Sequence, residues 1–447
     1  MAHIVQSQFC PERGLIYLLV SGDDPDKKWK SAEEILSSRP ELIELHEKLY
    51  NLKSKHYPQS FAIKPRLIPK TYQDLIENCL DEEHYNGSLD LMESFQNERE
   101  YLPVYHIRQI MGIIVDETVE NSLVIRAYKL LQHILQTCGA EPFQSVWKID
   151  KANIEQGFIW CEYPLDFWKF FETKLMLTLN DDSSSKVDRT LMLLNHLTNV
   201  HEMDIINNLE SSLLIQLFTK NYGKVRTNIK YPIEALLAPF STDDIIPIRT
   251  ARVAQRLLEQ IILLSYAGII CTDTLKRELY LLIIKLNPDN FRVFFQTLPC
   301  TTFKCKLLDH ALQDTNLGEV QREHRYLCNA SLDLSKIIHV YFQSKPYYRR
   351  VCRSTAIWRH TFMLMTLLQS YIQSKSLRIS EKIYNGLRDD EKKLFVEDLV
   401  RQKLEELAQW IADEKNIKKE FRQSAKLLID LASIVLDMQC SMEIEEN

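Results

Sequence analysis

A basic stretch interrupts an otherwise acidic chain, and its residue types are suited to binding anionic groups. Between Leu334 and Ser380 there are eight Lys or Arg residues and no Asp or Glu, although the chain has a net charge of −6. Five of these cations gather with aromatic side chains, namely Lys345, Arg349, Arg350, Arg353 and Arg359. Guanidinium groups form bidentate hydrogen bonds with phosphate and carboxylate groups. The stretch predicts a site for nucleic acid or an acidic protein, unless acids elsewhere in the fold pair with its cations.

Helical phasing divides this stretch into two halves. On a helix that begins near residue 345, Arg349, Arg353 and His360 share one face. Phe362 and Met365 fall on roughly the opposite face, and the residues after them are apolar almost all round. We therefore expect an exposed cationic first half, about 345–360, and a buried second half.

A second candidate site lies near the N-terminus, where a short apolar run precedes acidic residues. The residues are Ile16, Tyr17, Leu18, Leu19 and Val20, followed by Asp23 and Asp24. This is the form of a SUMO-interacting motif, which adds a strand to the edge of the SUMO sheet while its acids meet basic residues beside that edge. The pattern is degenerate. A strand packed on this chain's own helices is the alternative interpretation.

The spacing of the possible Cys and His ligands gives little support for a metal-binding site. Cys300, Cys305 and His310 are separated by five residues each, with His324 and Cys328 further along. Steps of five place successive side chains about 140° apart on a helix, so they cannot converge from one helix. We predict ordinary core residues here, and no metal or cofactor.

The glycines exclude several enzyme classes. The chain has ten, and the closest two, Gly14 and Gly22, are eight residues apart. A phosphate-binding P-loop, a dinucleotide-binding turn and a nucleophile elbow each need closer glycines. No histidine is paired with a plausible nucleophile, so we predict no catalytic residues. An unrecognised helical enzyme, with a pocket of convergent carboxylates or histidines, stays an open alternative.

The remaining composition is that of a soluble intracellular protein. The ten cysteines include no CxxC pair, which suits reduced thiols in the nucleus or cytosol. The apolar runs are too short for a signal peptide or a membrane span.

The elements that must position these residues are almost all helices. Apolar residues recur at helical spacing through most of the chain, including 40–52, 87–95, 121–137, 187–199, 203–218 and 272–287. The only strand we expect is 15–20. Residues 231–247 contain three prolines and suggest a connector between lobes. The predicted fold is all-α, an irregular multi-helix bundle or solenoid, with an irregular N-terminal extension (1–70) and two helical lobes (71–240 and 241–447).

Residues 66–138 carry a resemblance to a known family. The shared features are an Arg-Leu start at Arg66, a helix with a Glu-Asn end, a helix led by Pro103 that ends in two aliphatic residues, and an Ala-Tyr-x-Leu-Leu helix from Ala127. A weaker echo occurs at 291–312. The region resembles the helical domain of the SUMO-interacting motif-containing protein family, which is similar to the fifth non-SMC element of the SMC five–six complex.

The resemblance implies a non-enzymatic, all-helical scaffold subunit in the nucleus, with the cytoplasm as a second compartment. Such a subunit forms a heterodimer with a sixth-element-like partner, the SMC five–six localisation factor. The pair recruits or loads the SMC complex on chromatin for DNA repair and genome stability. SUMO and DNA are further candidate partners, and no membrane is expected. The alternative is an adaptor that binds nucleic acid or an acidic protein through residues 345–360.

Overall fold

The computed structural model of the 447-residue chain describes residues 3–10, 15–21, 40–56, 66–97, 100–143, 146, 167–180, 184–219, 229–315, 341, 359–360, 362–367 and 369–371. Contacts between Cα atoms divide the chain into two units. The first comprises Met1–Trp29 and Leu42–Pro299, and the second comprises Lys30–Glu41 and Cys300–Asn447. The described residues are helical apart from four strands and short turns, which confirms the all-α prediction.

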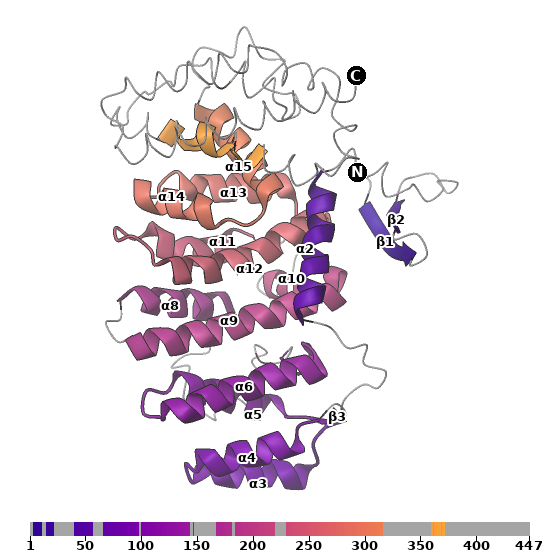
Figure 1. The fold of residues 1–447 in the computed structure, drawn as a ribbon, viewed down its shortest axis with the longest axis vertical. Coiled ribbons are helices and arrows are strands. Elements are labelled where there is room, and N and C mark those ends of the chain that lie inside the picture. The colour runs from indigo at the N-terminus through magenta and orange to yellow at the C-terminus, as the bar shows by residue number, and fades with distance from the viewer. Residues whose placement is uncertain are drawn as a thin grey trace, which may run out of the picture. The chain divides into compact units, whose positions relative to one another are not determined.

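The first unit is a stack of helices (Figure 1). Three pairs follow one another along the chain: α3 (Lys70–Asp81) with α4 (Tyr85–Phe95), α5 (Val104–Val115) with α6 (Asn121–Cys138), and α8 (Phe167–Asn180) with α9 (Ser184–Asn207). The next layers are α11 (Lys230–Leu237) with α12 (Ile248–Tyr266), and then α13 (Thr272–Ile283) and α14 (Pro288–Thr297). Helix α4 packs on α6, α5 and α6 pack on α9, α9 packs on α12, and α13 and α14 pack on α12. Each layer therefore buries its apolar side against the next, as in a solenoid.

Shorter elements link these layers. They are η1 (Glu141–Phe143), η2 (Leu209–Ser211), α10 (Leu213–Thr219) and η3 (Ala238–Ser241). In the second unit the long described helix is α15 (Thr301–Thr315). None of the helices in the described ranges combines the length and apolar character needed to cross a membrane.

A buried arginine ties one layer to the next. Arg189 of α9 is 7% exposed and donates hydrogen bonds to the carbonyl oxygens of Asp116 and Val119. It also donates to Oδ1 of Asn121, at 2.6 Å. The two carbonyls lie in the turn between α5 and α6, and Asn121 is the first residue of α6. The guanidinium therefore satisfies backbone groups that the turn leaves without helical partners.

A buried asparagine, Asn290, satisfies backbone groups in the segment between α11 and α12. Its side chain is fully buried, and Nδ2 donates to the carbonyl oxygens of Phe240, Thr242 and Asp244. Its Oδ1 accepts a hydrogen bond from the Ile246 amide, at 2.9 Å. One side chain therefore fixes the path of the whole segment.

The proline-rich segment 231–247, which we interpreted as a connector between lobes, contains regular structure. Pro232 lies in the first turn of α11, Pro239 lies in η3, and Pro247 comes directly before α12. Proline is tolerated at the start of a helix because the amide it lacks has no partner there. The boundary that we placed between residues 240 and 241 falls in η3, inside the first unit.

The N-terminal region contains more regular structure than predicted. The expected strand is confirmed as β2 (Leu15–Ser21), and it pairs antiparallel with β1 (His3–Cys10), which we did not predict. Helix α2 (Pro40–His56) is also confirmed and extends beyond residue 52. Strands β3 (Arg66–Leu67) and β4 (Glu100–Tyr101) form a short parallel pair beside α3.

Candidate interaction surfaces

The predicted SUMO-binding residues Ile16–Val20 lie in β2. The backbone of β2 pairs on one side with β1, in a sheet of two strands within the described residues. A third strand could add only along the other side of β2, which is how strand addition works. Asp23 and Asp24 lie outside the described residues, so SUMO binding stays a prediction.

The structure describes only Arg359 of the five predicted basic residues. Lys345, Arg349, Arg350 and Arg353 lie outside the described residues. Arg359 is half-buried, and burial lowers the pKa of its guanidinium. A half-buried arginine is less suited to phosphate contact than the exposed cation we expected.

His360 was predicted on the exposed face, and this was wrong. The residue is 3% exposed, and burial lowers the pKa of its imidazole to about 4. Leu364 and Leu367, one and two turns later on the same helical face, are buried as well. Phe362 and Met365 are buried as predicted, so this part of the chain is apolar on more than one side.

The possible metal ligands show no convergence within the described part. Cys300 and Cys305 are buried and His310 is half-buried on α15, while His324 and Cys328 lie outside the described residues. Among the residues that the structure describes, no group of three or more His, Cys, Asp or Glu could hold a metal ion.

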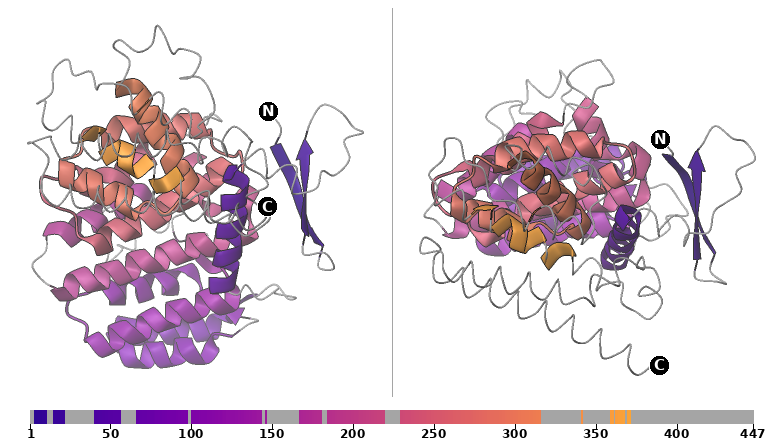
Figure 2. Two further views of the ribbon diagram at one scale, coloured as in Figure 1. Left: turned by 45° about the horizontal axis from the view of Figure 1, so that its top comes forward. Right: turned by 90° about the horizontal axis from the view of Figure 1, so that it is seen from above.

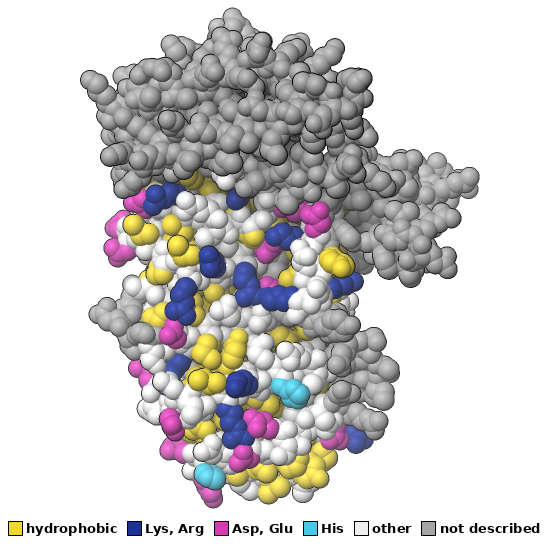
Figure 3. Space-filling view, in the orientation of Figure 1, with side chains coloured by type: hydrophobic (Ala, Val, Ile, Leu, Met, Phe, Trp, Pro, Cys, Tyr) yellow, Lys and Arg dark blue, Asp and Glu magenta, His cyan; other side chains and the backbone are white. Residues whose placement is uncertain are grey.

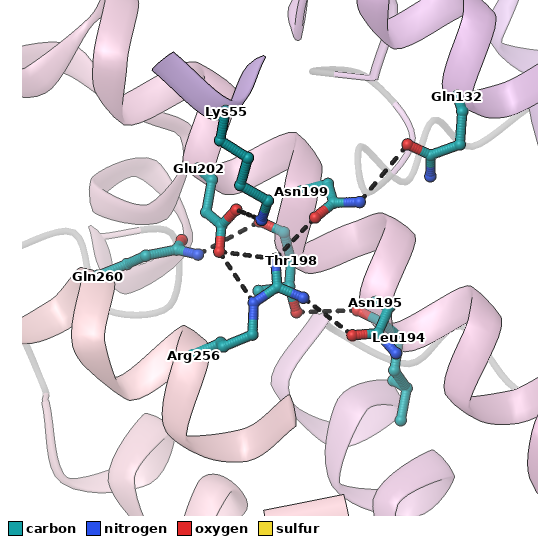
Figure 4. Close-up of polar contacts among 9 residues, drawn as sticks. All are labelled: Lys55, Gln132, Leu194, Asn195, Thr198, Asn199, Glu202, Arg256 and Gln260. Carbon is teal, nitrogen blue, oxygen red and sulfur yellow. Dashed lines mark hydrogen bonds and ion pairs between the residues drawn. The ribbon is translucent and has the colours of Figure 1, made fainter. Parts of the chain in front are cut away.

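A polar network joins α9 and α12, and no sequence signal pointed to it (Figure 4). Arg256 of α12 donates from Nε and Nη2 to Oε1 of Glu202, at 3.0 and 2.7 Å. Its Nη1 donates to Asn195 Oδ1 at 2.9 Å, and Nη2 donates to Asn199 Oδ1 at 2.7 Å. The three acceptors are spaced four and three residues apart on α9, so they form one polar stripe facing the guanidinium.

The network continues to neighbouring helices. Lys55 of α2 donates to the second carboxylate oxygen of Glu202, at 2.7 Å. Asn199 donates to Oε1 of Gln132 on α6, at 3.5 Å, and Gln260 donates to the Thr198 carbonyl at 3.2 Å. The Glu202 side chain is only 4% exposed, and two cations compensate its charge. A buried carboxylate needs such partners, because an unpaired one costs several kcal/mol.

Helix α2 lies across the stack (Figures 1 and 2). Three polar contacts along its length hold it there. The Tyr266 hydroxyl donates to Glu44 at 2.8 Å, Lys48 pairs with Glu259 at 2.7 Å, and Lys55 pairs with Glu202. These partners come from α9 and α12, so α2 fastens two layers of the stack. The network and α2 together hold helices in register, and most of their donors and acceptors are engaged with one another.

Two buried histidines, His196 and His201, lie on α9. Burial lowers the pKa of His196 to about 3 and that of His201 to about 4. His201 packs edge-on against Phe167, with ring centres 4.9 Å apart, and His196 Nδ1 lies 3.0 Å from Gln132 Nε2. Both rings are neutral at physiological pH and are packed as core residues.

A different surface lies at the end of the stack formed by α3 and α4. Leu67, Tyr72 and Leu75 are 49, 39 and 48% exposed, and Figure 3 shows hydrophobic side chains gathered at this end of the molecule. Leu75 is next to Ile76 in α3 and belongs to the same apolar run. Only Ile76 is fully buried in α3.

No family model and no curated protein matches the chain.

Proposed function

We propose that the chain is a non-enzymatic helical scaffold subunit that pairs with a sixth-element-like localisation factor. The pair recruits or loads the SMC five–six complex on chromatin in the nucleus, for genome maintenance. The observation that carries the proposal is that residues 66–138, on which the resemblance depends, form two complete helix pairs, α3 with α4 and α5 with α6, at the start of a longer stack. Stacked helix pairs offer extended surfaces for partner proteins.

The use of polar groups within the stack also supports a scaffold. Arg256, Glu202 and their amide partners bond one another, and the buried histidines of α9 are packed against aromatic and amide side chains. A general acid or base must reach a reacting group and needs a pKa near the working pH. His196 and His201 meet neither requirement, because they are buried and their pKa values are lowered to about 3 and 4.

Affinity purification of the tagged full chain from nuclear extract, followed by mass spectrometry, tests the proposal. We expect the localisation factor and subunits of the SMC five–six complex to be recovered. The matched control is Leu131→Asp, which places a charge at a fully buried position of α6 and should abolish recovery. Recovery of neither partner class with the unchanged chain would contradict the proposal.

The alternative function, an adaptor for nucleic acid or an acidic protein, rests on the acid-free basic stretch. Phosphate contacts would make the affinity for DNA fall steeply as salt is raised. Replacing Arg349 and Arg353 with Glu should then abolish retention on DNA at low salt, with Arg252→Glu on α12 as the control. Unchanged retention in the double variant would remove this alternative.

A further inference from the structure

The α3 end face is an apolar surface at the end of a helix stack, where a polar one is usual. We define it by five side chains: Leu67, Tyr72 and Leu75, which are exposed, and Leu91 and Phe95, which are half-exposed. Terminal repeats of solenoids normally present a polar outer face, because the apolar one would be left in water. Exposed apolar side chains gathered in one place often mark an interaction site.

The geometry makes this face two helices wide. The ring of Tyr72 stacks on the ring of Phe95, with centres 4.1 Å apart and planes 8° apart. Leu75 lies one turn after Tyr72 on α3, and Leu91 lies one turn before Phe95 on α4. The side chains of neighbouring helices therefore form one continuous apolar strip, a suitable seat for a third helix.

The charges around the strip are strongly acidic. Between Arg66 and Phe95 there are seven carboxylates and two cations, Arg66 and Lys70. Arg66, which is next to Leu67, pairs with Glu100. Lys70 pairs with Asp74 and Glu77, at 2.9 and 3.8 Å. On α4, Asp90 and Glu93 pair with Arg126 of α6.

Three of the carboxylates have no cation beside them in the described part of the chain. They are Asp81, Glu82 and Glu83, at the C-terminal end of α3. The carboxyl end of a helix carries partial negative charge, so acids there raise the electrostatic energy of the free protein. A positively charged partner would remove that penalty.

We propose that the α3 end face binds a basic amphipathic helix of a partner protein. The apolar side of that helix would cover Tyr72, Leu75 and Phe95, and its Lys and Arg residues would meet the carboxylates at the end of α3. A second copy of this chain does not fit, because a symmetric contact would bring the same acids together. Nucleic acids and anionic membranes would be repelled for the same reason. The inference rests on the proposed scaffold function only in requiring a protein partner.

The test uses the full chain and a designed probe peptide. The probe is a fluorescent amphipathic helix of about five turns, with Leu along one side and Lys and Arg on the other. Its controls are a scrambled peptide of the same composition and a version with Glu in place of the cations. Fluorescence anisotropy should show binding of the basic amphipathic peptide alone, weakening as salt is raised.

Two variants locate the binding surface. Leu75→Glu should weaken binding of the probe about tenfold or more, since it places a charge in the centre of the apolar strip. The matched control is Leu281→Glu on α13, where the wild-type side chain is 45% exposed, and it should bind the probe as the unchanged chain does. Circular dichroism would establish that both variants are folded. Equal binding of the scrambled peptide, or equal affinity of the Leu75→Glu variant, would overturn the proposal.

The same variants separate this inference from the proposed function. If Leu75→Glu loses the probe while the nuclear purification recovers no SMC subunit, the α3 end face stands and the SMC role fails. If the probe fails to bind while the localisation factor is recovered, the scaffold role stands and this face is not the docking surface.

Discussion

The network around Arg256 and the α3 end face use charge in opposite ways. In the network, Glu202 is 4% exposed and lies between Arg256 and Lys55, so opposite charges neutralise one another inside the stack. At the α3 end face, carboxylates outnumber cations along the two helices that carry the exposed apolar side chains. The first arrangement is complete within one chain, whereas we propose that the second is complementary to a basic helix of a partner protein. Closed polar networks fix how helices pack, and open ones are available for recognition.

The acids at these two places also differ in their effect on the stability of the fold. An unpaired carboxylate at the position of Glu202 would destabilise the fold, so its partners are required for folding. The acids at the end of α3 form no ion pair with a described residue, and their place at the negative end of the helix costs stability. Local arrangements that break a rule without compensation are expected at functional sites.

The largest expected effect on stability distinguishes two neighbouring residues of α3, the buried Ile76 and the exposed Leu75. Ile76→Ala should lower the free energy of unfolding by about 3 kcal/mol, because the side chain is fully buried. Leu75→Ala, at the neighbouring exposed position, should change it by less than about 0.5 kcal/mol. Denaturant unfolding followed by circular dichroism measures both. A similar loss in the two variants would mean that Leu75 belongs to the core and not to a binding face.

Next in size is the loss of the closed network. Arg256→Ala should lower the free energy of unfolding by about 2–3 kcal/mol, since it leaves Glu202 with Lys55 alone and two amide oxygens without a donor. The matched control is Arg252→Ala on the same helix. Arg252 is exposed and makes no ion pair with a described residue, so we expect a change within about 0.5 kcal/mol. Equal losses of stability in the two variants would mean that Arg256 contributes no more to folding than an exposed arginine does.

Acid should weaken the closed region through its buried histidines. The pKa of His201 is lowered to about 4 in the folded chain, whereas an unfolded histidine titrates near 6.5. The unfolded chain therefore binds the proton first, so stability is complete above pH 6.5 and is lost as the pH falls toward 4. His201→Phe, which keeps a ring against Phe167, should reduce the loss between pH 6.5 and 5 by about 1–2 kcal/mol.

Unfolding midpoints measured across this pH range test the expectation. His133→Phe serves as the control, because His133 is exposed on α6. An unchanged pH profile in the His201→Phe variant would show that this ring does not contribute to acid sensitivity.

The smallest effect should be a gain at the open end. Glu83 has a φ of 56°, a left-handed conformation that glycine adopts without strain. Glu83→Gly should therefore raise the free energy of unfolding by about 1 kcal/mol, whereas Glu82→Gly, at φ −84°, should not. The same Glu83→Gly variant should bind the basic probe peptide more weakly. Greater stability without weaker binding would show that this acid plays no part in recognition.

Much of the fold could be predicted from the spacing of apolar residues. Helices over 40–52, 87–95 and 121–137 are confirmed with small changes at their ends, and Gly139 ends α6 at φ 68°. The break that we expected between 199 and 203 is absent, because His201, Glu202 and Asp204 are buried polar residues of one continuous α9. A prediction from apolar spacing assumes that polar residues are exposed. It therefore misses helical segments in which polar residues are buried. Strand β1 escaped prediction because it lacks a continuous apolar run.

The candidate sites were harder to predict. Basic and β-prone runs are visible in one dimension, and they led us to residues 345–360 and 16–20. Lys55, Gln132, Glu202 and Arg256 come from four helices, so nothing in their spacing shows that they meet.

The sequence by itself determined the all-α class, most helix positions, and the segment that resembles a known family, because these depend on local periodicity and short patterns. Only the tertiary structure decided which charges are neutralised and which apolar side chains stay in water. Leu75 and Ile76 are neighbours of similar chemistry, yet one is 48% exposed and the other is fully buried. That difference depends on where α3 lies in the stack, at an end where no further layer of the described chain covers it.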